Sequence, residues 1–360
     1  MTNSQSTIRV GLNGYGVIGK RVADAVACQD DMELVGVADV VADWRMQMAA
    51  AKGFRLFAST DASVAAMRGA GLKVDGNLPD LLKSLDVIVD CTPKLVAGKN
   101  AEQYRKFGIK FIVEGGEKHE LTGHSFVAEA NYAESVGRQS TRVVSCNTTS
   151  IVRTLTALKR AGLLRRARGT LMRRATDPWE SDKGGIMNTI VPEHEIPSHQ
   201  APDAQSVDPE LDVVTIAVKV PETIAHLHSW AVQLSRKASK EEVLDAFRSS
   251  SRIALVRFSD GLTALNSIKE LMSDVGRPRD NLYEVALWED LVTVKGDEVF
   301  YAYMVDNQAI VIPETIDAIR ALSGRERDAD VSIRKTNAAL GIGQFLPSTV
   351  QRARRREMVR

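Results

Sequence analysis

The sequence predicts two domains of different class, an α/β domain built on a parallel sheet and an α+β domain with a mostly antiparallel sheet. Its 360 residues exceed what one compact core usually holds. Up to about residue 116, short apolar runs alternate with helix-like stretches, whereas after about residue 142 long β-branched runs follow one another closely. The first pattern is typical of parallel strands joined by crossover helices, and the second of an antiparallel sheet.

Composition is that of a soluble globular chain and excludes several classes of protein. Hydrophobic residues make up 44% of the chain and charged residues 26%, which excludes wholesale disorder. The 47 Lys and Arg residues nearly balance the 46 Asp and Glu residues, so we expect no nucleic-acid partner. No apolar run approaches the ~18 residues of a membrane-spanning helix, and the first residues lack the pattern of a secretion signal. We therefore expect a cytoplasmic protein without membrane contact.

The first domain, expected over residues 1–141, contains the alternating pattern. Short apolar runs predict strands at residues 8–12, 33–37, 86–91 and 109–113. Amphipathic spacing predicts helices at residues 17–28 and 96–107. Strands and helices in this order favour a parallel sheet with right-handed crossovers.

The second domain is expected over residues 142–312. Long apolar runs predict strands at residues 213–220, 224–234 and 252–258 and two more joined at residues 295–298. Pro313 opens a helix at a position that needs no amide donor, and a further helix is expected over residues 332–340. We expect the helices of residues 313–345 to pack on the first domain and residues 346–360 to form a basic tail.

A glycine-rich loop connects the first predicted strand to the first predicted helix. It holds Gly14, Gly16 and Gly19 in the pattern G-x-G-x-x-G. Gly14 permits a tight turn, Gly16 lets the backbone approach a pyrophosphate, and Gly19 lets helix and strand pack closely. Because free amides at a helix start favour an anion, this loop predicts a Rossmann-type dinucleotide-binding domain. The alternative is a glycine turn without a ligand.

Asp39 ends the second predicted strand, 20 residues beyond Gly19. A carboxylate there can accept hydrogen bonds from both ribose hydroxyls of NAD, and it repels the 2′-phosphate of NADP. The sequence therefore predicts NAD as the preferred cofactor, with NADP as the alternative.

The three cysteines are too few for a disulfide framework and lack the spacing of a metal site. Cys146 follows an apolar run and precedes a helical pattern in which Asn147 and Thr148 are suitable capping residues. At a helix N-terminus the dipole favours thiolate, the nucleophilic form. Free cysteines are also often inert core residues, and we assign that role to Cys28 and Cys91.

His226 and His228 lie two residues apart in a predicted strand, so both rings project from one face. Such a pair can supply a general base, contribute to a metal site or simply pack. No third ligand is evident nearby in the sequence, so we expect no metal. Arg173 and Arg174 lie on another predicted strand and suit phosphate recognition, the alternative being solvated charge.

Taken together, these features resemble the archaeal-type (type II) phosphorylating glyceraldehyde-3-phosphate dehydrogenase family. The resemblance extends from Ile8 to about Leu340. The matching motifs are Asn13–Gly16, Gly19–Ala25, Gln29–Met32, Asp90–Pro93, Gly115–Glu120, Arg142–Thr149, Pro197–His199 and His226–His228. It implies an α/β Rossmann-type dinucleotide-binding domain plus an α+β catalytic domain with a mostly antiparallel sheet.

The resemblance also implies a role for each matching residue. Cys146 matches the family's nucleophile and His226 its base. To Gly14, Gly16, Gly19 and Asp39 it adds, as cofactor contacts, Val17, Ile18, Gly116, Arg173 and Asn307. The positions that match substrate contacts are Ser145, Cys146, Asn147, Thr148, His199 and Gln200. Gln200 stands where the family has a second histidine, and Asp39 where some relatives have a basic residue that tolerates NADP.

The implied reaction is the reversible, phosphorylating oxidation of D-glyceraldehyde 3-phosphate to 1,3-bisphosphoglycerate through a thioester, with hydride transfer to NAD or NADP. Inorganic phosphate is the second substrate, and a homotetramer is the implied assembly. Aspartate-semialdehyde and N-acetylglutamyl-phosphate reductases offer an alternative, because they share the architecture and a cysteine–histidine pair. A binding role for RNA is supported only by the basic tail at Arg352–Arg356.

Overall fold

The computed structural model describes residues 7–114, 116–181 and 185–343. The chain forms two compact units, and the first is discontinuous in sequence. Unit 1 comprises the described residues of 7–145 together with 311–340, and unit 2 those of 146–310 together with 341–343. The basic tail expected at residues 346–360 lies outside the described residues.

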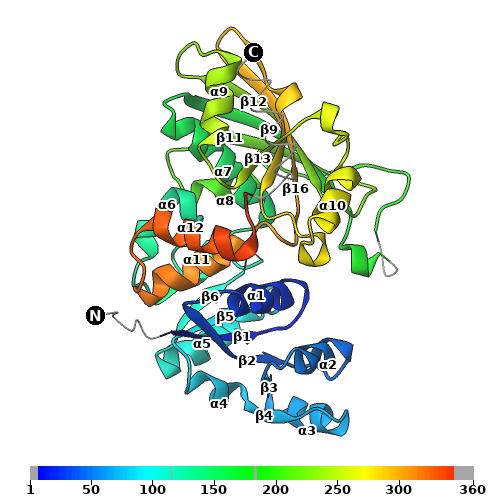
Figure 1. Cartoon of the computed structure of the whole chain (residues 1–360), viewed down its shortest axis with the longest axis vertical. Coiled ribbons are helices and arrows are strands. Elements are labelled where there is room, and N and C mark those ends of the chain that lie inside the picture. Colours follow the sequence, from blue (N-terminus) through cyan, green and yellow to red (C-terminus); the bar gives the residue numbers. More distant parts are fainter. Residues whose placement is uncertain (1–6, 115, 182–184, 344–360) are drawn as a thin grey trace. The chain divides into compact units, whose positions relative to one another are not determined.

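Unit 1 is built on an eight-stranded sheet in which every pairing is parallel (Figure 1). The order is β4-β3-β2-β1-β5-β6-β8-β7. The strands are β1 Ile8–Asn13, β2 Met32–Asp39, β3 Leu56–Ala58, β4 Val74–Asn77, β5 Val87–Asp90, β6 Lys110–Val113, β7 Ser125–Phe126 and β8 Ser140–Val143. This confirms the predicted α/β class, and β1, β2, β5 and β6 confirm the four predicted strands.

Helices connect these strands. They are α1 Val17–Ala27, α2 Trp44–Ala51, α3 Asp61–Gly69, α4 Leu78–Leu82, α5 Ala97–Phe107 and α6 Ala128–Ser135, with a short 3-10 turn at His119–Leu121. One core cluster packs α4 and α5 on the sheet through Leu81, Ile88, Tyr104 and Phe111, all almost fully buried. Because both faces of a parallel sheet are covered, its strands are continuous apolar runs, which is why they were evident in the sequence.

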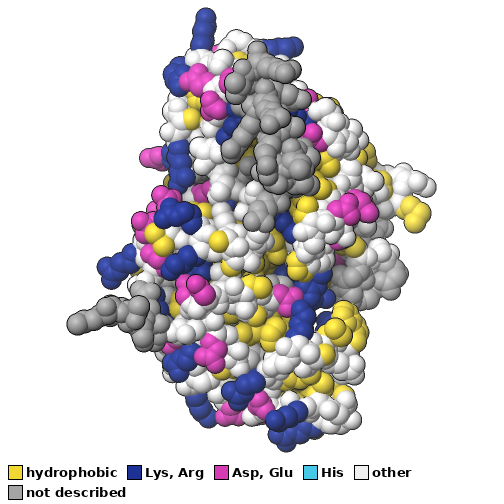
Figure 2. All heavy atoms as spheres, in the orientation of Figure 1, with side chains coloured by type: hydrophobic (Ala, Val, Ile, Leu, Met, Phe, Trp, Pro, Cys, Tyr) yellow, Lys and Arg dark blue, Asp and Glu magenta, His cyan; other side chains and the backbone are white. Residues whose placement is uncertain are grey.

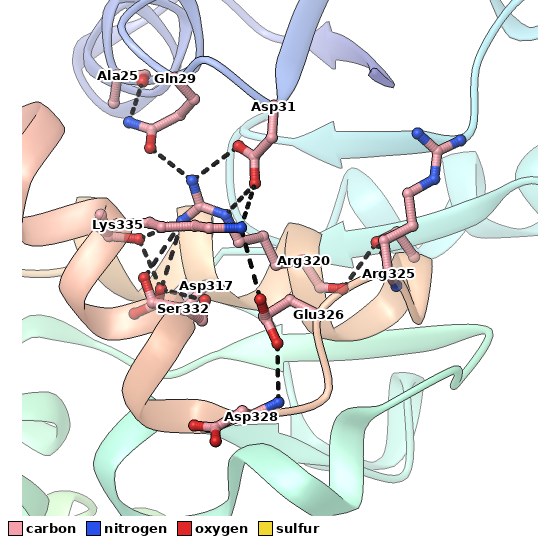
Figure 3. A network of polar contacts seen from close by, with 12 residues as sticks. Ala25, Gln29, Asp31, Asp317, Arg320, Arg325, Glu326, Asp328, Ser332 and Lys335 are labelled. Carbon is pink, nitrogen blue, oxygen red and sulfur yellow. Dashed lines mark hydrogen bonds and ion pairs between the residues drawn. The ribbon is translucent and has the colours of Figure 1, made fainter. Parts of the chain in front are cut away.

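Two late helices, α11 Ile312–Ser323 and α12 Ala329–Leu340, complete unit 1. Helix α11 is buried from its first residue to Leu322 and packs on β6 and β8. Its Arg320 is fully buried and binds both oxygens of Asp31, at 2.8 Å each, at the start of β2. Figure 3 shows this guanidinium among Asp31, Gln29 and residues of α12. An ion pair between α11 and the start of β2 therefore ties the late helices to the first part of the chain.

Unit 2 is built on a mixed, mostly antiparallel sheet, as predicted (Figure 1). Its order is β10-β11-β9-β12-β16-β14-β13, with β15 paired to β16. Among the described strands of this second sheet, only β11 with β9 and β13 with β14 run parallel. The strands are β9 Leu164–Arg174, β10 Val191–Pro192, β11 Val213–Val220, β12 His226–Leu234, β13 Ile253–Val256, β14 Val285–Trp288, β15 Thr293–Lys295 and β16 Glu298–Val305.

Helices of unit 2 pack on this sheet. They are α7 Cys146–Arg160, α8 Gln200–Gln205, α9 Lys240–Arg248 and α10 Leu265–Asp274, with short 3-10 turns at Pro178–Glu180, Phe258–Asp260, Pro278–Asp280 and Glu289–Leu291. Helix α7 contacts β9 and β16, α8 contacts β11, and α9 contacts β13. Helix α7 is therefore the element that holds Cys146 against the sheet.

One expectation about packing is wrong. The sequence predicts an inert core role for Cys28, but this residue is exposed as the C-cap of α1, because that helix ends at Ala27. Charged side chains of both signs are interspersed on the face drawn in Figure 2. In the part of the chain that the structure describes, no helix is long and apolar enough to span a bilayer. Nor do the described His, Cys, Asp and Glu residues form a group of three or more that could hold a metal ion.

Candidate active site

Cys146 is the first residue of α7, so its thiol lies at a helix N-terminus as predicted. The side chain faces strand β12, and its Sγ lies 3.6 Å from Nε2 of His226. His226 and His228 are both buried and project from the same face of β12, as their spacing predicted. The structure therefore brings the two residues with predicted catalytic roles together within unit 2.

A backbone contact determines where His226 carries its proton. The amide N–H of Arg174, at the end of β9, donates to Nδ1 of His226 at 3.1 Å. A ring nitrogen that accepts a hydrogen bond cannot carry a proton, so the proton of the neutral ring is on Nε2. Nε2 is the nitrogen that faces the sulfur. The ring is therefore oriented as a hydrogen-bond donor to Cys146.

The helix dipole favours the thiolate form of Cys146, as expected from its position, but burial has the larger effect on the thiol. Burial raises the pKa of the Cys146 thiol to about 11, although Arg174 and Arg173 oppose this rise. Burial also holds the pKa of His226 well below its usual value, with further lowering by His228 and the two arginines. At neutral pH the pair therefore consists of a protonated thiol and a neutral imidazole rather than an ion pair.

Asn147 follows the cysteine and belongs to a line of hydrogen-bonded side chains in unit 2. Its side-chain oxygen lies 2.9 Å from Nε2 of His228, and Nδ1 of His228 lies 3.0 Å from the hydroxyl of Tyr303 on β16. Burial lowers the pKa of His228 to about 3, so this ring is neutral too. Sequence reasoning missed Tyr303, because it lies 75 residues from His228 in the chain.

The two arginines at the end of β9 are held by carboxylates. Arg173 forms an ion pair with Glu193, and Glu193 also lies 3.3 Å from Nδ1 of His199. Arg174 lies 2.9 Å from Asp177. Both guanidinium groups are close enough to Cys146 to lower the pKa of its thiol, against the stronger effect of burial. They supply positive charge beside the cysteine.

The remaining predicted substrate residues differ in their surroundings. Ser145 immediately precedes Cys146 and ends the first segment of unit 1. Thr148 is buried, and its hydroxyl donates to Asp203 of α8 at 2.6 Å, so this side chain holds α8 in place. Gln200 is fully buried, and neither end of its amide has a partner among the described residues. Buried amides seldom remain unpaired, so Gln200 retains capacity for a ligand.

The glycine loop of unit 1 has the geometry that a pyrophosphate requires. Gly14 has φ +95°, and a Cβ there would lie 2.8 Å from the backbone of Cys91. A Cβ on Gly19 would lie 1.9 Å from the carbonyl oxygen of Gly14, whereas a Cβ on Gly16 would meet open space. Helix α1 begins at Val17 without a side-chain cap. Its first amides, including that of Ile18, are therefore suited to an anion, and the loop fits a dinucleotide.

Asp39 is buried at the end of β2 and already accepts three backbone hydrogen bonds. One oxygen accepts from Tyr15 N–H at 2.6 Å, and the other from Val40 and Val41 N–H at 2.7 and 3.2 Å. This carboxylate therefore holds the glycine loop in place as well as presenting negative charge. A carboxylate offers about four acceptor positions, so it can still accept from a ribose hydroxyl.

Two further predicted cofactor residues lie in different units. Gly116 is exposed in a turn of unit 1. Asn307 is nearly buried in unit 2, and its side-chain oxygen has no partner among the described residues. Its neighbour Gln308 donates instead to Asp177 at 2.8 Å. Of these two amides, Asn307 is the one with an unpaired oxygen.

A Rossmann-type unit and a second unit in which a half-buried cysteine lies beside a buried histidine define an oxidoreductase that uses a nicotinamide dinucleotide. The family model "Glyceraldehyde 3-phosphate dehydrogenase, C-terminal domain" matches residues 145–290. The model "Dihydrodipicolinate reductase, N-terminus" matches residues 8–122.

Curated relatives match almost the whole chain. The chain is 42% identical over 335 residues to the glyceraldehyde-3-phosphate dehydrogenase of Methanobrevibacter smithii, covering 92% of this chain and 99% of the relative. Identity to the enzyme of the same name from Methanococcoides burtonii is 44%, covering 93% and 99%. For the Thermococcus kodakarensis enzyme it is 42%, covering 93% and 99%. The chain therefore belongs to the archaeal-type glyceraldehyde-3-phosphate dehydrogenase family, as its motifs predicted.

Proposed function

We propose that this protein catalyses the reversible, phosphorylating oxidation of D-glyceraldehyde 3-phosphate to 1,3-bisphosphoglycerate through a thioester on Cys146. The observation that carries this proposal is the 3.6 Å approach of the Cys146 sulfur to Nε2 of His226 at the start of α7. The reaction is expected to run in the cytoplasm, in glycolysis or gluconeogenesis.

The first step is attack of the Cys146 thiolate on the aldehyde carbon. Ionisation of the thiol releases one proton to solvent, and the new carbon–sulfur bond leaves an oxyanion on the former aldehyde oxygen. His226 carries its proton on Nε2, beside the sulfur, and donates it in a hydrogen bond to that oxyanion. We therefore assign His226 the role of donor, instead of the base that the resemblance implied.

The second step turns the oxyanion into a thioester. A bound nicotinamide would supply the acceptor for the hydride that leaves the carbon as the carbon–oxygen double bond forms. Inorganic phosphate then attacks the thioester carbon, and the thiolate of Cys146 leaves to give the acyl phosphate. The positive charge of Arg173 and Arg174 beside Cys146 favours the approach of this anion and stabilises the departing thiolate.

The resemblance assigns cofactor binding to the glycine loop with its neighbours and to Arg173 and Asn307. In unit 1 the glycine loop, with Val17, Ile18 and Gly116, would hold the dinucleotide. In unit 2 the unpaired oxygen of Asn307 can accept a hydrogen bond from a carboxamide, and Arg173 supplies charge. The buried carboxylate of Asp39 supports NAD as the preferred cofactor, because it repels a 2′-phosphate.

Substrate binding is assigned to residues around Cys146. Ser145 and Asn147 flank the nucleophile, and the unpaired amide of Gln200 and the exposed ring of His199 offer further donors. Thr148 contributes indirectly by holding α8. The expected domain limits at residues 141, 312 and 345 and the homotetramer remain part of this proposal.

The proposal is tested by steady-state assays of the purified protein with glyceraldehyde 3-phosphate, aspartate semialdehyde and N-acetylglutamate semialdehyde. Each aldehyde is assayed with and without phosphate, and with NAD or NADP. We expect phosphate-dependent turnover of glyceraldehyde 3-phosphate with a preference for NAD. Cys146→Ser serves as the control, since it should abolish turnover and leave NAD binding unchanged. Preferred turnover of either semialdehyde would overturn the substrate assignment.

A further inference from the structure

A buried polar chain leads from β16 to the residue beside the nucleophile. Tyr303 contacts Nδ1 of His228 at 3.0 Å, and Nε2 of His228 contacts the side-chain oxygen of Asn147 at 2.9 Å. His228 and Tyr303 are completely buried, and Asn147 is almost completely buried. The proposed mechanism gives neither His228 nor Tyr303 a task. Burying three polar side chains lowers the stability of the fold unless each of their hydrogen bonds is made.

The direction of these hydrogen bonds follows from the neighbours. The Ser150 hydroxyl donates to the backbone carbonyl of Asn147 at 2.8 Å, so Ser150 offers Tyr303 only a lone pair, 3.4 Å away. The shorter 3.0 Å contact to Nδ1 of His228 therefore takes the Tyr303 proton. Because Nδ1 then accepts, the proton of this ring is on Nε2 and is donated to the oxygen of Asn147.

The orientation of the Asn147 amide is the consequence. Its oxygen is turned toward His228, and no described residue accepts a hydrogen bond from its Nδ2 group. If the protons of the Tyr303–His228–Asn147 hydrogen bonds were placed the other way round, the side-chain amide of Asn147 would have to be rotated by about 180°. The oxygen of Asn147 would then face the substrate, where negative charge develops as the thiolate adds to the aldehyde.

We propose that His228 and Tyr303 are positioning residues that hold the Asn147 amide with its NH2 group toward the substrate. This inference rests on the proposed function, because it makes the Asn147 NH2 group a second donor to the oxyanion formed at Cys146. Donors held in advance where charge develops accelerate such reactions, because they need not reorient during the step.

The test compares Tyr303→Phe with Tyr301→Phe in the full chain. Both substitutions remove one buried tyrosine hydroxyl from β16, but only Tyr303 contacts His228. For Tyr303→Phe we expect kcat with glyceraldehyde 3-phosphate to fall about 10- to 100-fold, the effect of one hydrogen bond to a charged group. Its Kd for NAD should not change. Tyr301→Phe should stay within about threefold of the parent protein. Equal losses in both variants would overturn the proposal.

A second pair of variants separates positioning from packing. Gln at position 228 can still donate to the oxygen of Asn147, whereas Leu cannot. We therefore expect His228→Gln to retain most of the turnover and His228→Leu to lose about as much as Tyr303→Phe. Thermal unfolding of each variant is measured alongside. If His228→Gln is as slow as His228→Leu at equal stability, His228 does not act through its donor.

The last measurement needs neither cofactor nor turnover. Cys146 is alkylated with anionic iodoacetate and with neutral iodoacetamide, and its modification is followed by peptide mass spectrometry. An outward NH2 group of Asn147 attracts the anionic iodoacetate. The rate with iodoacetate divided by the rate with iodoacetamide should therefore fall about tenfold in Tyr303→Phe and stay constant in Tyr301→Phe. An unchanged ratio in Tyr303→Phe would refute the positioning role. A lower ratio in a protein that does not oxidise glyceraldehyde 3-phosphate would refute only the proposed function.

Discussion

At the scale of single residues, the surroundings of Cys146 determine how its reactivity depends on pH. Burial raises the pKa of this thiol to about 11, so the thiolate forms only as the pH rises toward that value. Below it, the reactive fraction grows about tenfold per pH unit. The rate of Cys146 alkylation by iodoacetamide, followed by peptide mass spectrometry from about pH 6 to about pH 10, should therefore rise throughout. A plateau near neutral pH would contradict this assignment.

The proton on Nε2 of His226 leads to a second prediction. Replacing His226 with Gln keeps an NH2 group near the position of Nε2, whereas Asn is too short to reach it. If His226 acts as a donor, His226→Asn should lower kcat by about 10²- to 10³-fold and His226→Gln by much less. Steady-state kinetics of both variants at equal substrate concentration provide the comparison. Equal losses would favour a general base, which neither amide can replace.

Some of the site could be predicted from the sequence and some could not. The glycines, Asp39 and Cys146 follow local patterns of strand end, loop and helix start, which short segments of chain specify. The pKa of Cys146 depends on burial and on arginines of strand β9, so local patterns could not predict a protonated thiol. Tyr303 was missed for a similar reason, since its contact with His228 depends on the register of β12 with β16.

At the scale of elements, the completely buried guanidinium of Arg320 should dominate the attachment of α11 to unit 1, because it neutralises Asp31 and the completely buried Asp317, 3.9 Å away. Removing one partner of a buried pair leaves an uncompensated charge, which typically costs about 3–5 kcal/mol. Arg320→Met should therefore lower the free energy of unfolding by about that amount, measured by urea denaturation. Arg325→Met is the matched control, because Arg325 lies 3.3 Å from Asp86 but is itself 30% exposed, whereas Arg320 is completely buried. Ion pairs at the surface contribute only about 0–1 kcal/mol to the free energy of unfolding. Equal losses in Arg320→Met and Arg325→Met would contradict the larger role of Arg320.

The same ion pair predicts a dependence of stability on pH. Burial alone would raise the pKa of Asp31, but its hydrogen bonds and attraction to Arg320 outweigh burial and hold the pKa below the usual value of 3.8. A carboxyl whose pKa is depressed in the folded state stabilises the fold above its unfolded pKa and loses that contribution as the pH falls through the folded pKa. Thermal unfolding should therefore show a smaller loss below about pH 4 in Arg320→Met than in the parent protein. An equal loss would mean that other carboxyl groups determine acid stability.

Elements differed in how readily the sequence predicts them. Strands β1, β2, β5 and β6 are buried in the centre of a parallel sheet and form plain apolar runs. Strands β3 and β7, with three and two residues, are too short to give a periodic signal. Helix α11 was recognisable from Pro313, but its ion pair with Asp31 joins residues 289 positions apart. Local patterns contain no information on such a pairing.

At the scale of the whole molecule, exposed apolar side chains indicate where copies of the chain would meet. Met187, Ile190 and Ile196 of unit 2 are 83%, 60% and 68% exposed. Covering such side chains is a common reason for assembly. If the protein is a homotetramer, Met187→Asp combined with Ile190→Asp should reduce its mass in solution from four chains of 39.4 kDa to fewer, as measured by light scattering. Loss of the tetramer by a surface substitution elsewhere, such as Lys295→Asp, is not expected.

Because unit 1 is built from two separate segments of the chain, it cannot complete its fold until late in synthesis. A ribosome releases residues 7–145, then all of residues 146–310, before it releases the helix that covers β6 and β8. At about 5–20 residues per second, the nascent first segment waits roughly 10–40 seconds for α11 and α12. During that interval the apolar surface of β6 and β8 that α11 later buries is open to solvent. Chaperones that bind apolar surface would therefore meet this segment before unit 1 can close.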